Sequence, residues 1–102
     1  MQIEVSKRAQ RQWLHILTYY YEVGGERAAV KLHNKYLQKQ EHVLRFPESG
    51  FPEPLLSERK ILYRSVIIND FYKFIYYTKG NVIRIAAFWD MRMHPDNLSK
   101  TI

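Results

Sequence analysis

The chain has 102 residues, which is enough for one domain with a buried core and too few for two. Its 46% hydrophobic content excludes a disordered chain, and 16 Lys and Arg against 10 Asp and Glu give a net charge of +6, which favours a polyanionic partner. It has no cysteine, which excludes disulfides and thiolate metal sites, and no apolar stretch of membrane-spanning length, so we expect a cytoplasmic protein without membrane contact.

The first half of the chain predicts a short strand and two helices. Ile3–Val5 alternates apolar and acidic residues, as in a strand, and Ser6 stands where a helix N-cap is expected. Apolar residues at helical spacing then predict an amphipathic helix over residues 6 to about 22. Gly24-Gly25 ends it, and a second helix follows over residues 26–45. Because the connection is short, the two helices should lie antiparallel as a hairpin.

The second half predicts an antiparallel sheet. A proline-rich loop at residues 46–54 ends the second helix, and three strands are then predicted over Arg59–Ile68, Phe71–Thr78 and Asn81–Trp89. The order is β-α-α-β-β-β, an α+β fold in which the helical hairpin packs on one face of the sheet. We find no internal repeat and no linker, so residues 1–102 should form a single domain.

Two tight turns decide which side chains share a face of this sheet. If Asn69-Asp70 and Lys79-Gly80 are two-residue turns, one face is almost wholly apolar and consists of Ile61, Tyr63, Ile67, Tyr72, Phe74, Tyr76, Ile83, Ile85 and Ala87. The opposite face then carries the cations Arg64, Lys73, Arg84 and Arg92, and we expect it to bind something anionic. A one-residue change in either turn would move some of these residues to the other face.

The chemistry available to the chain is limited. There is no glycine-rich phosphate loop, and the four histidines lack metal-ligand spacing, so no cofactor or metal is predicted. Cations interleaved with aromatic rings suit RNA, and fixed positive groups also stabilise the charge that builds on phosphoryl oxygens during attack by a ribose 2′-hydroxyl. His94, beside Arg92, is the one histidine near that face with a natural pKa suited to proton transfer. Taken singly, each cation is also typical of a solvated strand residue.

The C-terminal half resembles a known family. Residues 72–76 (YKFIY), 82–85 (VIRI) and 88–95 (FWDMRMHP) are similar to the end of toxins of the RelE/ParE superfamily from bacterial type II toxin–antitoxin systems. In these toxins a Tyr-Arg-x-x-Tyr strand is followed by an apolar strand and an Arg-x-x-Pro ending. The order of elements in the first half agrees, and Tyr63-Arg64 is similar to a second Tyr-Arg strand of the family.

This resemblance implies a growth-inhibiting toxin of the kind that stabilises plasmids, neutralised by an antitoxin encoded by a neighbouring gene. In the ribonuclease branch of the family, basic residues on the sheet bind and cleave messenger RNA on the ribosome. Lys73 stands at the position of an arginine of that branch, and Arg92 stands near another. The branch often adds an aromatic residue or histidine at its C-terminus, for which His94 is the available substitute. The implied catalytic residues are Lys73, Arg92 and His94, with Arg64 and Arg84 as further phosphate ligands.

Three interpretations stay open at this point. The first is a metal-independent endoribonuclease that acts on ribosome-bound messenger RNA. The alternative is a ParE-like inhibitor that binds DNA gyrase without catalysis, and the Arg-x-x-Pro ending, Arg92 to Pro95, resembles that branch at least as closely. A third is an inactive, toxin-like interaction module. Whether the protein is an enzyme is therefore left open by the sequence.

Overall fold

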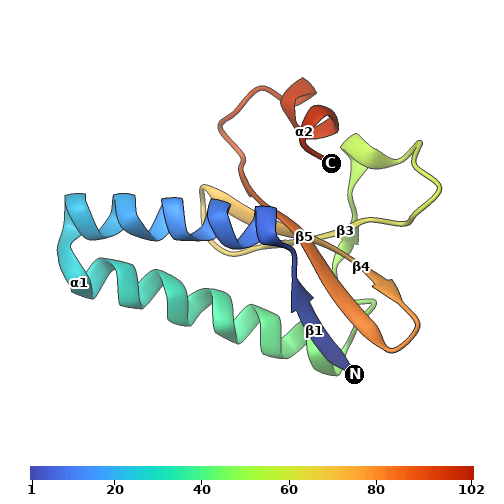
Figure 1. Cartoon of the computed structure of the whole chain (residues 1–102), viewed down its shortest axis with the longest axis horizontal. Helices are drawn as coiled ribbons and strands as arrows, with labels where there is room; N and C mark the ends of the chain where they lie inside the picture. Colours follow the sequence, from blue (N-terminus) through green and yellow to red (C-terminus); the bar gives the residue numbers. More distant parts are fainter.

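The computed structural model describes residues 1–102 and shows a pair of helices packed against a five-stranded sheet (Figure 1). The elements in chain order are β1 (Gln2–Val5), α1 (Lys7–Arg45), β2 (Phe51–Pro52), the 3-10 helix η1 (Pro54–Leu56), β3 (Arg64–Ile67), β4 (Tyr72–Lys79), β5 (Val82–Asp90) and α2 (Asp96–Thr101). The strand order is β1-β5-β4-β3-β2, with β1 parallel to β5 and the other pairs antiparallel. The predicted α+β class is confirmed. The elements β2, η1 and α2 were not predicted.

The helical hairpin forms as its sequence indicates. Ser6 caps α1, because its hydroxyl accepts a hydrogen bond of 3.1 Å from the backbone N–H of Ala9. Gly25 has φ 82° and ψ −178°, a conformation that only glycine adopts readily, and this residue interrupts the helix. The two halves of α1 therefore run antiparallel on one side of the sheet (Figure 1).

The main core lies between this hairpin and the sheet. It consists of Ala9, Trp13, Leu32, Tyr36, Val43, Ile68, Tyr72, Phe74, Tyr76, Ile83, Ile85 and Phe88. Aromatic rings dominate its contacts: Trp13 stacks on Phe88 with ring centroids 4.6 Å apart, and Tyr36 meets Phe74 edge-on at 5.6 Å. Burial in this core raises the pKa of Tyr36 to about 12.

The predicted turn at Asn69-Asp70 is wrong by one residue. Ile67 pairs with Lys73 and the N–H of Ile68 bonds to the carbonyl of Tyr72, so the connection has three residues. The Asn69 carboxamide oxygen favours this longer turn, because it accepts hydrogen bonds of 2.9 Å from the N–H groups of Phe71 and Tyr72. The slip reverses the faces of β3: Arg64 and Val66 lie on the helix side, whereas Ser65 and Ile67 do not.

A β-bulge changes the faces of β5. The turn is Gly80-Asn81 and not the predicted Lys79-Gly80, since Lys79 pairs with Val82. The pairing shifts by two positions, so Ile83 and Ile85 stay on the helix side as predicted. Between the pairs Tyr76–Ile85 and Ile75–Ala87, however, Ala86 has no partner. After Ala86, even-numbered residues of β5 face the helices and odd-numbered residues face away, the reverse of the arrangement before it. Phe88 therefore enters the main core, whereas Trp89 faces the other way together with Ala87, which was predicted to lie on the apolar face.

The sheet face opposite the hairpin is also covered. Leu56 of η1 and Leu98 of α2 close over Ile75 and Trp89, with Tyr63 and Ile102 packed at the margin. In Figure 1 the C-terminal helix and the loop that carries η1 lie on the same side of the sheet, away from α1. The first strand of the predicted meander also begins at Arg64 rather than Arg59. The open cationic face predicted from the sequence is therefore absent. No helix combines the length and apolar character needed to cross a membrane.

Candidate functional site

The four cations predicted to share a face are distributed over the molecule. Arg64 lies on the helix side and donates hydrogen bonds to the carbonyl oxygens of Glu48 and Gly50, at 3.2 and 2.8 Å. Arg84 lies on the opposite face of the sheet and pairs with Glu4 of β1 at 3.0 Å, with both side chains about half exposed. Lys73 is buried. The prediction of one open anion-binding sheet face is therefore wrong. The longer turn before β4 moves Arg64 to the helix side, and the bulge in β5 reverses the alternation that leads to Arg92. Lys73 keeps the predicted side together with Arg84 but is covered by Glu53.

Lys73 is occupied by a buried ion pair. Its ammonium group contacts the carboxylate of Glu53, and the two side chains are 10% and 1% exposed. The same carboxylate accepts a hydrogen bond of 2.7 Å from the Ser65 hydroxyl and one of 3.0 Å from the N–H of Leu55. Burial by itself raises the pKa of Glu53, but these hydrogen bonds and the charge of Lys73 outweigh it, so the pKa lies below its usual value. The cation of Lys73 is thus neutralised and shielded from solvent.

Glu53 is the partner that sequence reasoning missed. It lies 20 residues before Lys73, in the proline-rich loop, and it caps η1 through its hydrogen bond with Leu55. A possible signal was its place immediately before Pro54, since an acidic residue followed by proline is typical of a helix start. Nothing in the local sequence indicates that this carboxylate turns inward.

Arg92 is held rigidly at the end of β5. Its guanidinium group makes two hydrogen bonds of 2.9 Å to the Asp90 carboxylate, and its carbon lies 4.4 Å from the ring centroid of Phe71. It also donates to the Tyr72 hydroxyl at 3.3 Å. The hydrogen bond from Arg92 holds the pKa of Asp90 below its usual value, and that of Arg92 is raised in turn. Arg92 keeps more than half of its side chain exposed, so the guanidinium group stays accessible to a partner although it is paired with Asp90.

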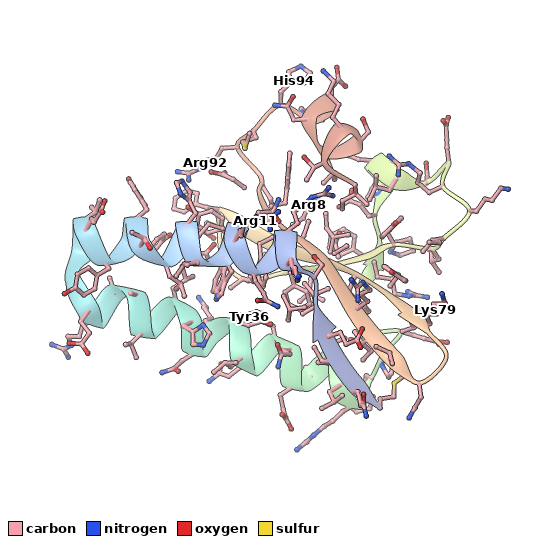
Figure 2. The ribbon with its side chains drawn as sticks, viewed as in Figure 1. Arg8, Arg11, Tyr36, Lys79, Arg92 and His94 are labelled. Atoms are coloured by element: carbon pink, nitrogen blue, oxygen red, sulfur yellow. The ribbon has the colours of Figure 1, made fainter.

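A cleft of about 630 Å³ opens beside Arg92, between the first half of α1 and the end of β5. Its lining residues are Arg11, Gln12, His15, Ile16, Tyr19, Tyr72, Phe88, Trp89, Asp90, Arg92, Met93 and Thr101. Arg11 and His15 come from one side of the helix, one turn apart, and face the C-terminal segment. Figure 2 shows Arg8, Arg11 and Arg92 along this side of α1. The cleft thus combines aromatic and aliphatic walls with cations, a surface suited to an acidic amphipathic partner.

His94 lies outside this cleft. Its side chain is 70% exposed, and its Nδ1 atom accepts a hydrogen bond of 3.2 Å from the N–H of Asp96. It projects from the loop before α2, at the outer end of the C-terminal segment (Figure 2). The three predicted catalytic residues therefore lie in different places. Lys73 is in a buried ion pair, Arg92 is bound to Asp90 at the surface, and His94 is in an exposed loop. Their catalytic roles stay predictions, without a shared site to support them.

Two arginines that the sequence did not single out fix the C-terminal segment. Arg59 donates to the carbonyl oxygens of Ser99 and Ile102 at 2.8 and 3.0 Å, and Arg8 of α1 donates to the carbonyl of Thr101. Cations at the C-terminal end of a helix satisfy its free carbonyl groups and complement its dipole. The two arginines thereby tie α2 to the rest of the molecule. No group of three His, Asp or Glu side chains is placed to hold a metal ion.

Comparisons with known proteins agree with the overall fold. The family model described as ParE toxin of type II toxin-antitoxin system, parDE, matches residues 3–95. The fold is similar to a solved structure titled "Chromosomal ParDE TA system from P. aeruginosa", with a TM-score of 0.71 and 18% sequence identity over 88% of this chain and 95% of that one. The comparison with curated protein sequences finds no match. The similarity of the solved structure concerns the fold, whereas the family match covers nearly the whole sequence.

Proposed function

The chain belongs to the ParE toxin family of type II toxin–antitoxin systems, and on that premise we propose that it inhibits growth by binding DNA gyrase, without chemistry of its own. This was the alternative interpretation of the sequence. The first interpretation, cleavage of messenger RNA on the ribosome, is not supported by membership of this family. The ParE branch, as the resemblance implied, poisons gyrase and lacks the ribonuclease residues.

The burial of Lys73 is the observation that carries the proposal. A ribonuclease of the predicted kind needs a free cation at this position to stabilise charge on the scissile phosphate. Here the ammonium group is bound to Glu53 beneath η1, and a phosphate could reach it only if that carboxylate and the loop moved away. The side chain therefore fits a structural role, which is compatible with a toxin that acts by binding.

The cleft beside Arg92 is the best candidate for the contact surface. Arg92 is oriented by Asp90 and Phe71, so little conformational entropy is lost when it meets a partner. Arg11 makes no ion pair within the chain and lines the same cleft. We propose that this cleft contacts gyrase, and that a cognate antitoxin from a neighbouring gene neutralises the toxin by covering the cleft with an acidic, amphipathic segment.

A variant without the charge of Lys73 distinguishes a toxin that acts by binding from one that acts by catalysis. The double variant Glu53→Gln, Lys73→Met removes both charges together and keeps the side-chain volumes, so the fold should persist. Each protein is induced in cells, and gyrase-linked DNA breaks and cleavage of abundant messages are measured. We expect the double variant to keep its toxicity and its DNA breaks, with messages intact. Loss of toxicity in a folded double variant, together with message cleavage by the wild type, would contradict the proposal.

A matched pair of variants tests the cleft. Arg11→Gln removes one cation from the cleft, and Lys79→Gln removes one from the tip of the β4–β5 hairpin (Figure 2). We expect Arg11→Gln to weaken inhibition of gyrase about tenfold and Lys79→Gln to leave it within twofold, because a single unpaired interfacial cation is worth roughly 1 to 2 kcal/mol. Equal effects of the two substitutions would show that net charge matters and the cleft does not.

A further inference from the structure

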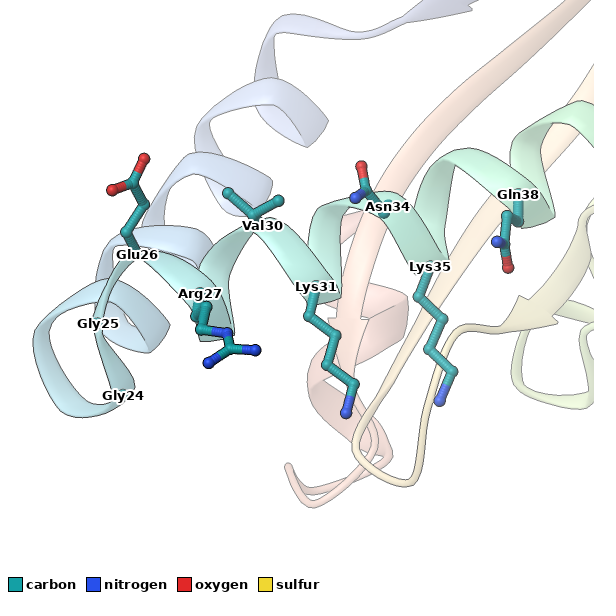
Figure 3. Close-up of a pocket in the computed structure, with 9 residues that line it drawn as sticks. All are labelled: Gly24, Gly25, Glu26, Arg27, Val30, Lys31, Asn34, Lys35 and Gln38. Carbon is teal, nitrogen blue, oxygen red and sulfur yellow. The ribbon is translucent and has the colours of Figure 1, made fainter.

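The second half of α1 carries a row of exposed cations that the proposed function does not use. Arg27, Lys31 and Lys35 follow one another at intervals of four residues, all are exposed, and none takes part in an ion pair or a side-chain hydrogen bond. Figure 3 shows the three side chains projecting to the same side of the helix, with Glu26 pointing the other way. We call these three residues the basic ridge.

The neighbours of the basic ridge make it a region of uncompensated charge. Side chains three and four positions apart on a helix are neighbours, and like charges at that spacing destabilise the helix. Around the ridge these positions are filled by Val23, Gly24, Ala28, Val30, Leu32, Asn34, Gln38 and Lys39, without one carboxylate. Further along the same helix, Glu41 does pair with Arg45 at this spacing, at 3.8 Å. The three cations are therefore free to contact an anion from outside the chain.

The surface around the ridge is polar, which distinguishes between kinds of partner. A shallow hollow of about 830 Å³ extends from Gly24 to Gln38 along the helix, and of its nine lining residues only one, Val30, is hydrophobic. Protein–protein interfaces are built around an apolar core. Protein–DNA interfaces are more polar and much more basic. The ridge has the polar and basic composition of a protein–DNA interface, whereas the cleft beside Arg92 has the apolar lining of a protein–protein interface.

The spacing of the ridge suits a phosphate backbone. At 1.5 Å per residue, Arg27 and Lys35 are about 12 Å apart along the helix axis, with Lys31 midway. A strand of duplex DNA passes about three phosphates over that distance, at roughly 3.4 Å of rise each. Arginine and lysine are the side chains that most often contact phosphate oxygens, and such contacts carry no sequence information.

From these observations we propose that the basic ridge binds the phosphate backbone of duplex DNA, independently of sequence. The preference for DNA over RNA rests on the proposed function, because a gyrase inhibitor acts where gyrase holds DNA. The ridge lies on the second half of α1 and the Arg92 cleft on the first half, so one toxin has separate surfaces for DNA and for the enzyme.

The test measures binding to a 20-base-pair DNA duplex of arbitrary sequence by fluorescence anisotropy, without gyrase, at several salt concentrations. Three phosphate contacts imply a slope of about −2.7 in log affinity against log salt, so their contribution should fall roughly fortyfold between 50 and 200 mM. The salt-dependent contribution of the ridge should be lost in the ridge variant, which combines Arg27→Gln, Lys31→Gln and Lys35→Gln. A control variant removes the same net charge from other exposed sites and should keep the full salt dependence; it combines Lys60→Gln, Lys79→Gln and Lys100→Gln.

Several results would overturn the proposal. Equal losses in the two triple variants would attribute DNA binding to net charge, and an unchanged slope in the ridge variant would exclude the ridge. Loss of antitoxin affinity with unchanged DNA affinity would assign the ridge to an acidic protein, and tighter binding to an RNA duplex of the same length would exclude DNA as the preferred partner. Supercoiling assays keep the two proposals apart. If the ridge variant loses DNA affinity and still inhibits gyrase at saturating concentration, the ridge binds DNA and is not required for inhibition. If the wild type binds DNA through the ridge but does not inhibit gyrase, the proposed function fails and the ridge proposal stands.

Discussion

The two faces of the sheet are covered in different ways. On one face, long helical segments of α1 bury a continuous and almost wholly apolar core rich in aromatic rings. On the other, two short elements, η1 and α2, bury four apolar residues and a salt bridge between Glu53 and Lys73. The packing on the first face is made of many similar apolar contacts, so no single one of them accounts for its stability. The second depends on a few specific ones, among them the buried salt bridge that holds Lys73, one of the predicted catalytic residues.

The largest expected effect comes from a cavity in the helix-side core. Phe74 is fully buried between Tyr36, Tyr76 and Phe88, so Phe74→Ala should lower the free energy of unfolding by about 3 to 5 kcal/mol. Urea denaturation followed by circular dichroism measures this, and Phe71→Ala, at a position 41% exposed, is the control. A loss below about 1 kcal/mol would mean that the core is not the principal source of stability.

A slightly smaller effect should follow when the buried ion pair is broken from one side. Lys73→Met leaves the Glu53 carboxylate without its cation, and we expect a loss of about 3 kcal/mol, because Ser65 and the Leu55 N–H still bind it. The double variant Glu53→Gln, Lys73→Met should recover most of that loss. If the single and double variants are equally stable, Glu53 and Lys73 are not energetically coupled, and the second face does not depend on their salt bridge.

Removing the anchor of the C-terminal helix should have a local effect. Leu98 is fully buried against Leu56, Ile75 and Trp89, and Leu98→Ala should weaken the docking of α2 by about 2 kcal/mol. In hydrogen exchange, the amides of α2 should lose protection while those of β4 and β5 keep it. Equal loss throughout the sheet would show that both cores unfold as one cooperative unit.

The pH dependence of stability should be the smallest and most specific signal. The folded-state pKa of Glu53 lies below its usual value of 4.5, so its contribution is complete above pH 4.5 and is lost as the pH falls through the folded-state pKa. Glu53→Gln should remove this part of the acid destabilisation. Asp90→Asn is the control, since that carboxylate also has a lowered pKa but is more exposed. An unchanged acid profile in Glu53→Gln would contradict the coupling to Lys73.

The difference between the faces also explains what could be predicted from the sequence. Helical periodicity and the Gly24-Gly25 break predicted the hairpin, since both depend only on neighbours in the chain. The strands β4 and β5 were placed within a residue or two. The faces of the sheet on which the cations lie could not be predicted in this way. They depend on one extra residue in the Asn69 turn and on one unpaired residue, Ala86, and neither produces a periodic pattern in the sequence.

The residues around the candidate site were harder still. Arg92 and its place at the end of β5 were identified, but its clamp on Asp90 and Phe71 depends on the path of the chain after the strand. The burial of Lys73 required Glu53, which a loop brings back from 20 positions away. Such a contact is a product of the tertiary structure, so a single sequence read by local pattern could not have placed it.

Inhibition of gyrase by binding is tested most directly by a titration of purified gyrase with the purified toxin. A toxin that acts by binding should inhibit supercoiling in proportion to the enzyme it occupies, with inhibition complete near stoichiometric amounts and messenger RNA on ribosomes left intact. We expect that result for the wild type, and the same result for the folded variant without the Glu53–Lys73 pair. Unimpaired supercoiling at large excess of toxin, with messages cleaved by a small fraction of one toxin per ribosome, would contradict it.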